Sequence, residues 1–170
     1  MGVNLSGVSL SDPTLLDFIL GEFDRSGARP QDIVFEITET AAVANLSRAA
    51  RLIHRLREAG CRFALDDFGS GLSSFTYLRN LPVDYLKIDG SFVRAIAQDG
   101  VNLAMVEAIR RVAEVMGIRT IAESVESAGV IERIRSIGID FAQGYHLHVP
   151  EGYTKMRANL SRGNVTVAAA

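Results

Sequence analysis

The sequence is poor in the residues and runs that mark several common classes of protein. Cys61 is the single cysteine among 170 residues, so no disulfide can form within the chain. We interpret it as a packing residue in the core of a protein of the reducing cytoplasm. Acidic and basic side chains nearly balance, at a net charge of −2, so no basic field attracts nucleic acid or an anionic membrane surface.

Long apolar runs and several catalytic motifs are also missing. No stretch of about 18 apolar residues is present, so no transmembrane helix is expected, and the N-terminus lacks the basic flank and apolar centre of a signal peptide. No Gly-rich phosphate loop follows the first expected strand, which argues against a dinucleotide-binding sheet. No Gly-x-Ser-x-Gly turn supports a serine nucleophile. The three histidines are His54, His146 and His148. None of them joins the acidic positions described below, which argues against a histidine-based metal site.

What the sequence does contain is a regular alternation of short apolar strands and amphipathic helices. Hydrophobic residues make up 48% of the chain, enough for one globular domain with a sizeable core. The first long helix is expected to open at Asp12–Pro13 and to stop at Gly27. The other expected helices span 45–59, 101–116 and 130–137, and the expected strands span 3–6, 33–38, 63–66, 85–89, 119–122 and 140–143. With Tyr145–Val149 as a candidate seventh strand, the alternation indicates an α/β fold with right-handed βαβ units and a parallel sheet.

The stretch from Arg62 to Gly71 places two adjacent carboxylates at the end of an apolar strand. Asp66 and Asp67 would repel each other unless cations, protons or hydrogen bonds relieve the charge. Replacing either residue with Asn is therefore expected to leave the stability of the metal-free protein unchanged or slightly raised. Two interpretations stay open for Asp67: it caps the next helix, or it takes part in a cation site.

Further polar residues fall near the carboxyl ends of the other expected strands. In a closed parallel barrel these ends meet at one rim, where the active sites of that architecture lie. The acidic members offer hard oxygen ligands suited to Mg²⁺ or Mn²⁺. The residues at these strand ends are Glu36, Asp66, Asp67, Lys87, Asp89, Glu123 and Gln143.

Six short motifs occur along the chain in a fixed order. They are Val3–Ser6, Phe35–Glu39, Ala64–Gly71, Leu86–Asp89, Ala122–Glu126 and Gln143–Tyr145. Taken together they resemble the successive motifs of the EAL-domain family. The resemblance implies an α/β, TIM-type barrel and a bacterial phosphodiesterase that opens cyclic di-GMP to linear pGpG with two divalent cations, Mg²⁺ or Mn²⁺.

The resemblance also implies which oxygen-bearing side chains ligate the cations. The ligands of one cation would be Asn4, Glu36 and Asp66. The ligands of the second would be Asp66, Asp67 and Glu123. Two cations a few ångströms apart can activate water and stabilise both the attacking and the leaving oxygen of a phosphodiester displacement.

Roles for other side chains follow from the same resemblance. The catalytic residues would be Lys87, Glu123 and Gln143. Lys87 and Gln143 would hold or polarise the attacking water, whereas Asp89 and Glu126 would contact the bound nucleotide. Glu39 would anchor the loop of residues 68–74, whose position governs metal and substrate binding.

The sequence departs from the family pattern at its start and at two single positions. No Glu-Ala-Leu strand precedes Val3, although in the family that strand supplies a further ligand of the first cation and a nearby phosphate-binding arginine. Ser124 stands in place of the usual glycine, and Leu72 in place of a common tyrosine. We therefore expect an incomplete barrel of six to seven of the eight strands, formed by a truncated EAL domain over 1–150, with a partly helical and then frayed tail over 151–170.

Two other kinds of protein stay open beside the phosphodiesterase. One is a catalytically inactive EAL-like module that binds cyclic di-GMP or a protein partner, and the other is an unrelated metal-dependent hydrolase on a similar barrel. An open barrel invites self-association, and the resemblance implies a homodimer through the helix near Leu78 and Asp84–Tyr85. We also expect a cytoplasmic location, no nucleic-acid or membrane contact, and a longer parent protein with sensory or GGDEF-type domains.

Overall fold

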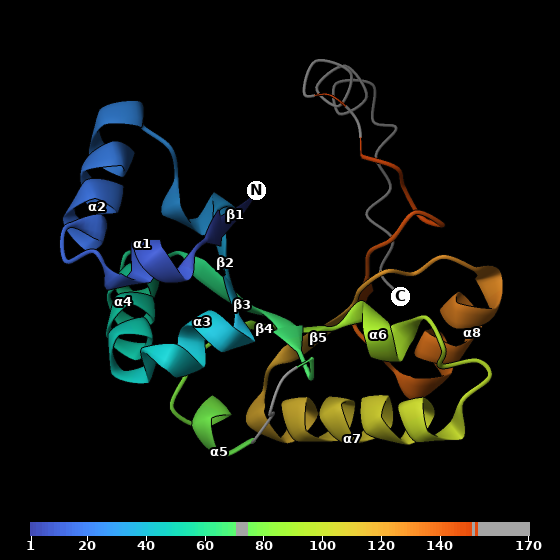
Figure 1. Ribbon diagram of the computed structural model, residues 1–170. Coiled ribbons are helices and arrows are strands. Elements are labelled where there is room, and N and C mark those ends of the chain that lie inside the picture. The colour runs from blue at the N-terminus through green and yellow to red at the C-terminus, as the bar shows by residue number, and fades with distance from the viewer. Residues whose placement is uncertain (71–74, 151, 153–170) are drawn as a thin grey trace.

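Six strands form one parallel sheet in the computed structural model, which describes residues 1–70, 75–150 and 152 (Figure 1). The strands are β1 (Gly2–Leu5), β2 (Val34–Thr38), β3 (Arg62–Phe68), β4 (Tyr85–Ile88), β5 (Arg119–Ala122) and β6 (Phe141–Ala142). They lie side by side in chain order and pair in parallel. Right-handed crossovers in such an order place the connecting helices on one face. The expected loop positions 71–74, including Leu72, and the expected tail at 151 and 153–170 lie outside the described residues.

Helices connect the strands, and a glycine directly follows three of the four helices expected to stop at one. The helix expected to stop at Gly60 ends at Glu58, with Ala59 as its C-cap. The helices are α1 (Gly7–Ser11), α2 (Leu15–Ser26), α3 (Glu39–Ala44), α4 (Leu46–Glu58), α5 (Phe75–Leu78), α6 (Gly90–Val93), α7 (Gly100–Met116) and α8 (Ala128–Ile137), with a 3₁₀ turn, η1, at Pro30–Asp32. Gly27, Gly117 and Gly138 follow α2, α7 and α8 with φ of 68°, 69° and 81°, a left-handed backbone that glycine adopts without steric cost.

The expected helix start at Asp12–Pro13 is wrong by a few residues. The Asp12 carboxylate accepts hydrogen bonds from the amide (2.8 Å) and the hydroxyl (2.7 Å) of Thr14. These bonds hold a turn between α1 and α2, so α2 begins only at Leu15.

One face of the sheet is apolar and packs against the helices. The register pairs Leu5 with Ile37, Ile37 with Leu65, and Leu65 with Leu86, so these side chains form a row across this face. All four are buried, together with Ile53 of α4. Each such side chain contributes about 1.5–3 kcal/mol on burial, so this layer fixes where the strands lie. In Figure 1, α4 runs beside β3, and α7 runs beside β4 and β5.

The opposite face of the sheet carries charged and aromatic side chains. Near the amino ends of the strands, the Tyr85 hydroxyl accepts hydrogen bonds from Arg62 (2.9 Å) and Arg119 (2.7 Å). The guanidinium carbon of Arg119 lies 4.5 Å from the ring centre of Tyr85 and 5.5 Å from that of Phe141. Because side chains alternate along a strand, Lys87 projects from the same face as Tyr85, toward the carboxyl ends.

The candidate seventh strand at Tyr145–Val149 is not formed. The carbonyl of Gly144 accepts hydrogen bonds from the amides of Leu147 (3.0 Å) and His148 (3.1 Å), and these bonds fold the segment into a turn. Within the described ranges the sheet therefore has six strands and is not closed into a barrel.

The exposed fractions of single side chains bear on two expectations from the sequence. Cys61 is 3% exposed, and burial raises the pKa of its thiol, which confirms its role in packing. Leu78 and Tyr85 are 0% and 8% exposed, so both are covered by the chain's own core, and a homodimer contact near them stays a prediction. In the part of the chain that the structure describes, no helix has the length and apolarity to cross a membrane.

Candidate active site at the carboxyl ends of the strands

Charged side chains from neighbouring strands meet at the carboxyl edge of the sheet. Glu36 extends from β2, Asp66 and Asp67 from β3, Lys87 from β4, and Glu123 follows β5 directly. The sheet thus brings together residues that lie up to 87 positions apart, as the strand-end prediction requires.

The ammonium group of Lys87 lies at the centre of this cluster. Its Nζ atom is 2.8 Å from Glu36 Oε2, 2.8 Å from Asp66 Oδ1 and 2.9 Å from Glu123 Oε1. Burial opposes the charge of the lysine, but the hydrogen bonds to Asp66, Glu123 and Glu36 outweigh it and raise the pKa of Lys87 above its usual range. Lys87 therefore stays protonated, so it can donate hydrogen bonds but cannot accept a proton.

Asp66, Asp67 and Glu123 form an acidic group in which one oxygen from each lies within 4.8 Å of the others. Burial raises the pKa of Asp67, and the nearby charges of Asp66 and Asp89 raise it further. Burial also raises the pKa of Glu123, against the opposing effect of Lys87. The three donors are carboxylates, so the group fits a hard divalent cation, whose charge would relieve their repulsion.

The second set of expected ligands comes from β1, β2 and β3. Asn4 lies beside Glu36 in the register of β1 and β2, while Glu36 and Asp66 meet through the ammonium of Lys87. A Cβ atom at Gly2 would lie 2.4 Å from Glu36 Oε1, so the glutamate side chain extends over the start of β1. The ammonium of Lys87 thus bridges two of the three oxygen-bearing side chains in this set, as it bridges Asp66 and Glu123 in the other.

A local change in the backbone of β3 lets consecutive residues serve one site. Asp67 has φ of 55°, and the pairing of β3 with β4 shifts between Leu65 and Phe68. In a regular strand Asp66 and Asp67 would point to opposite faces, whereas this bulge lets both carboxylates project at the rim. Asp67 lies within β3 and α5 begins at Phe75, so Asp67 is not the N-cap of that helix.

Glu39 joins three segments beneath the cluster. It is 4% exposed, its Oε2 accepts a hydrogen bond from the amide of Gly69 (2.9 Å), and its Oε1 accepts one from the hydroxyl of Tyr77. Gly69 has φ of 101°, and a Cβ atom there would lie 2.5 Å from the Phe92 ring. The start of the loop after β3 is thus held by α3 and α5, as a loop-anchoring role for Glu39 requires.

An open pocket of about 380 Å³ adjoins the cluster. The Gln143 side chain donates a hydrogen bond to Glu123 Oε1 (3.2 Å), which connects the pocket to the acidic group. The Val125 amide donates to the Gln143 carbonyl (3.0 Å), and a Cβ atom at Gly144 would lie 2.2 Å from the Val125 nitrogen. The pocket is lined by Arg94, Ser124, Glu126, Gln143, Gly144, Tyr145, His148 and Pro150.

Asp89 and Arg94 show what the sequence patterns revealed and what they missed. The Asp89 carboxylate accepts a hydrogen bond from the Ser91 amide (2.8 Å) and caps α6. Arg94 follows α6 directly and lines the pocket, although no sequence motif singled it out. Its contacts, to Ser124 and Glu126, join residues about 30 positions apart, which no local pattern reveals.

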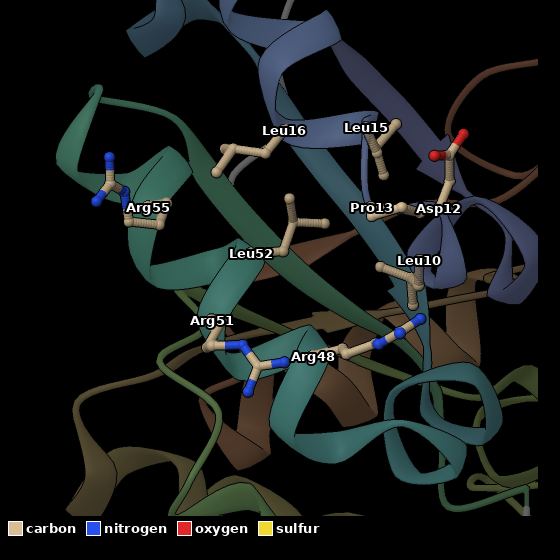
Figure 2. Close-up of a pocket in the computed structure, with 9 residues that line it drawn as sticks. All are labelled: Leu10, Asp12, Pro13, Leu15, Leu16, Arg48, Arg51, Leu52 and Arg55. Carbon is tan, nitrogen blue, oxygen red and sulfur yellow. The ribbon is translucent and has the colours of Figure 1, made fainter.

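A second groove lies away from the strand ends and contains none of the candidate residues. It has a volume of about 340 Å³ and lies between the α1–α2 region and α4, as Figure 2 shows. Its floor is formed by leucine side chains and Pro13, and three arginines of α4 lie along one side. The lining residues are Leu10, Asp12, Pro13, Leu15, Leu16, Arg48, Arg51, Leu52 and Arg55.

Comparison with known proteins places this chain in one family. The sequence profile of the EAL domain matches residues 1–150. Cyclic di-GMP phosphodiesterase PdeB of Shewanella oneidensis is 45% identical over 151 residues, which cover 89% of this chain and 18% of PdeB. The chain therefore spans about a fifth of the length of that relative.

Solved structures agree with the sequence match. The c-di-GMP complex of the MucR phosphodiesterase of Pseudomonas aeruginosa has a TM-score of 0.86 at 30% identity, over 91% of this chain and 63% of that one. The EAL domain of Mycobacterium smegmatis DcpA has a TM-score of 0.89 at 31% identity, over 97% of this chain and 74% of that one. The chain belongs to the EAL domain family.

Proposed function

We propose that the chain carries the catalytic carboxylates of a phosphodiesterase that hydrolyses cyclic di-GMP to linear pGpG. The observation that carries this proposal is the gathering of Asp66, Asp67 and Glu123 within 4.8 Å beside the buried ammonium of Lys87. Names of relatives support the substrate, since PdeB is a cyclic di-GMP phosphodiesterase. Family membership removes the support for an unrelated hydrolase on a similar barrel.

The proposed cofactors are two divalent cations, Mg²⁺ or Mn²⁺. Asp66, Asp67 and Glu123 would hold one, and Asn4, Glu36 and Asp66 would hold the other. When bound, such cations neutralise charge at a phosphodiester and lower the pKa of water. The all-oxygen donor set supports a hard cation over zinc.

Lys87 and Gln143 act on the attacking water in this proposal. Lys87 stays charged, but its three N–H donors face Glu36, Asp66 and Glu123. It would donate to the water, and stabilise negative charge developing on the phosphate, once one of these carboxylates ligates a cation instead. The Gln143 amide, which already donates to Glu123, offers a carbonyl oxygen that could orient the same water. Neither group takes the proton, which leaves a carboxylate of the cluster to accept it.

The nucleotide would occupy the pocket beside the cluster. Glu126 lines this pocket, and a carboxylate there suits the N1–H and N2–H donors of a guanine base. Asp89 would approach the ligand from the start of α6. Glu39 would fix the loop of residues 68–74 through its bond to Gly69.

A catalytically inactive EAL-like module that binds cyclic di-GMP or a protein partner is the second candidate. The specific observation in its favour is that Lys87 bridges Glu36, Asp66 and Glu123, so both proposed cation sets already contain an internal positive charge.

We also infer that the domain is part of a longer protein. We place its boundary after Pro150, where the family match ends. Coverage of only 18% of PdeB, and a bifunctional diguanylate cyclase/phosphodiesterase among the relatives, support a longer parent protein with sensory or GGDEF-type domains. We further propose that the domain works in the cytoplasm and forms a homodimer.

Hydrolysis measured on this chain separates the two candidate functions. Formation of pGpG from cyclic di-GMP is followed by ion-exchange chromatography with Mg²⁺, with Mn²⁺ and with EDTA. The phosphodiesterase predicts turnover that needs the metal, that is lost in Asp67→Asn, and that is kept in Asp24→Asn, a matched change on the exposed side of α2. Calorimetric binding of cyclic di-GMP without turnover supports the binding module. Tight binding of zinc with none of Mn²⁺ contradicts the cation assignment.

A further inference from the structure

Arg94 connects the two segments that border the candidate nucleotide pocket. It follows α6 directly, and its Nη2 donates a hydrogen bond to the Ser124 hydroxyl (3.0 Å), while its Nε lies 3.3 Å from Glu126 Oε1. We name these three side chains the Arg94 bridge. Because the guanidinium is planar, the two donors have fixed directions, so one arginine constrains both partners together.

Ser124 has a strained backbone that aims its hydroxyl at Arg94. Its φ is 52°, a left-handed conformation that is uncommon for a residue with a Cβ atom. A Cβ atom at Gly90 would lie 2.4 Å from Ser124 Oγ and 2.7 Å from Ser124 Cβ, so the serine side chain packs directly over this glycine. A strained residue next to Glu123 is the kind of feature that clusters at functional sites.

The turn that carries Glu126 is held from two sides. On one side, the Val125 amide donates to the Gln143 carbonyl and the His146 amide donates to the Val125 carbonyl, each at 3.0 Å. On the other side, within the described ranges, Arg94 is the side chain that pairs with Glu126. Backbone bonds and the Arg94 bridge therefore hold the turn together, and the bridge also fixes the direction of the Glu126 side chain.

We propose that Arg94 is a positioning residue of this pocket, which holds the Glu126 carboxylate in the direction that a bound guanine nucleotide meets. This inference rests on the proposed function, because it concerns the same ligand. Arg94 and Glu126 are 55% and 56% exposed, so their pair adds little to the stability of the free protein. Its effect falls on binding, because a glutamate held in one rotamer loses less conformational entropy when the ligand arrives.

Binding measurements distinguish positioning from direct contact with a phosphate. Cyclic di-GMP affinity is measured by calorimetry in Ca²⁺, a hard cation that carboxylates bind. Arg94→Met should weaken binding by about tenfold, as is common when the partner that orients a binding group is removed. Arg94→Lys should weaken binding as much, because an ammonium on a flexible chain cannot replace the two fixed donors. Arg51→Met, the same charge change at an exposed site on α4, should bind as the unmodified chain does.

A double-mutant cycle tests whether Arg94 acts through Glu126. In a Glu126→Ala background, Arg94→Met should cause no further loss of affinity, because its partner is already gone. A full additional loss in that background would overturn the proposal. So would normal binding by Arg94→Lys, which indicates that a positive charge near the phosphate is all that the ligand requires.

A measurement without ligand keeps this inference separate from the proposed function. Amide hydrogen exchange over residues 124–126 should be roughly threefold faster in Arg94→Met than in Arg51→Met. Equal rates would overturn the positioning role. If the unmodified chain binds no cyclic di-GMP, the proposed ligand is wrong, and the exchange rates alone decide whether the Arg94 bridge orders this turn.

Discussion

Asp66 and Asp67 are neighbours in sequence but have different electrostatic surroundings. Asp66 Oδ1 lies 2.8 Å from the Lys87 ammonium and also accepts a hydrogen bond from the Asp67 amide (3.0 Å). The Asp67 carboxylate lies near the charges of Asp66 and Asp89, and its pKa is raised. The sequence-based expectation treated the two aspartates alike, whereas the geometry separates them.

Replacing Asp67 with Asn should stabilise the metal-free protein, and replacing Asp66 should not. Asp67→Asn removes a repelled charge and should raise the free energy of unfolding by about 0.5 kcal/mol at this partly exposed site. Asn also tolerates the left-handed backbone at this position. Asp66→Asn weakens the ion pair of a buried lysine and should lower the free energy of unfolding by about 1–3 kcal/mol. Urea unfolding in EDTA measures both, and a less stable Asp67→Asn would contradict the assignment.

The stability difference between Asp67→Asn and the unmodified chain should grow as the pH rises. Its pKa is higher in the folded chain than in the unfolded one, so the folded state binds this proton more readily and stability is lost as pH rises through the folded pKa. Below the unfolded-state pKa of 3.8, Asp67 is protonated in both the folded and the unfolded state, and Asp67→Asn should have the same free energy of unfolding as the unmodified chain. By pH 7 the variant should be the more stable in EDTA. Addition of Mn²⁺ should reverse that order, because the metal then stabilises the unmodified carboxylate.

At the scale of secondary structure, Tyr77 joins α5 to α3. Its hydroxyl donates to the buried carboxylate of Glu39, which also accepts from the Gly69 amide. Burial, together with the hydrogen bond to Glu39, raises the pKa of Tyr77 above its usual range, so the phenol remains a donor. Two short elements and the start of a loop therefore depend on one glutamate.

Tyr77→Phe should weaken this connection without disturbing the rest of the core. Loss of the hydroxyl removes one hydrogen bond from a buried charge, which should lower the free energy of unfolding by about 1–2 kcal/mol. Tyr145→Phe is the matched control, because Tyr145 is 70% exposed and its change should be within about 0.5 kcal/mol. Equal urea midpoints for the two variants would contradict a structural role for this bond.

The elements that sequence reasoning predicted are those whose signals are local. Apolar runs marked the six strands, and Gly27, Gly117 and Gly138 marked the ends of helices because left-handed backbone favours glycine. The strand expected at Tyr145–Val149 is absent because Gly144 packs against the Val125 backbone, 19 positions away, and the chain turns there. No local pattern contains that contact.

The candidate site, like the fold, has features that the sequence predicts and features that it does not. Parallel strand ends predicted that Glu36, Asp66 and Glu123 would gather at one rim, since topology alone determines this. The central position of Lys87 and the pairing of Arg94 with Glu126 depend on side-chain distances across strands and turns. These distances are set by tertiary packing, which the order of residues does not display.

At the scale of the whole molecule, the sheet has two edges. In the described part of the chain, β1 and β6 each pair with one neighbour. Unpaired backbone groups on an edge strand are ready to pair with another chain. The arrangement therefore favours contacts between molecules.

We predict that the isolated chain associates with itself. Sedimentation velocity over a range of concentrations should show a weight-average mass that rises with concentration, with dimers or larger species at the upper end. The contact should leave Leu78 and Tyr85 inside the chain's own core, because both are buried there. A single monomeric species at every concentration, with a high melting temperature, would contradict this prediction.

Because each strand pairs with its neighbour in the chain, the sheet can form in sequence order while the protein is being synthesised. Each strand finds its partner in the strand made just before it, so the apolar layer can grow while the ribosome is still at work. Glu36, Asp66 and Lys87 are by then in place, but Glu123 and Gln143 arrive only with the last two strands. A nascent chain would therefore hold most of its sheet before it could hold the cation proposed for Asp66, Asp67 and Glu123, and competence to bind the nucleotide would be among the last properties to emerge.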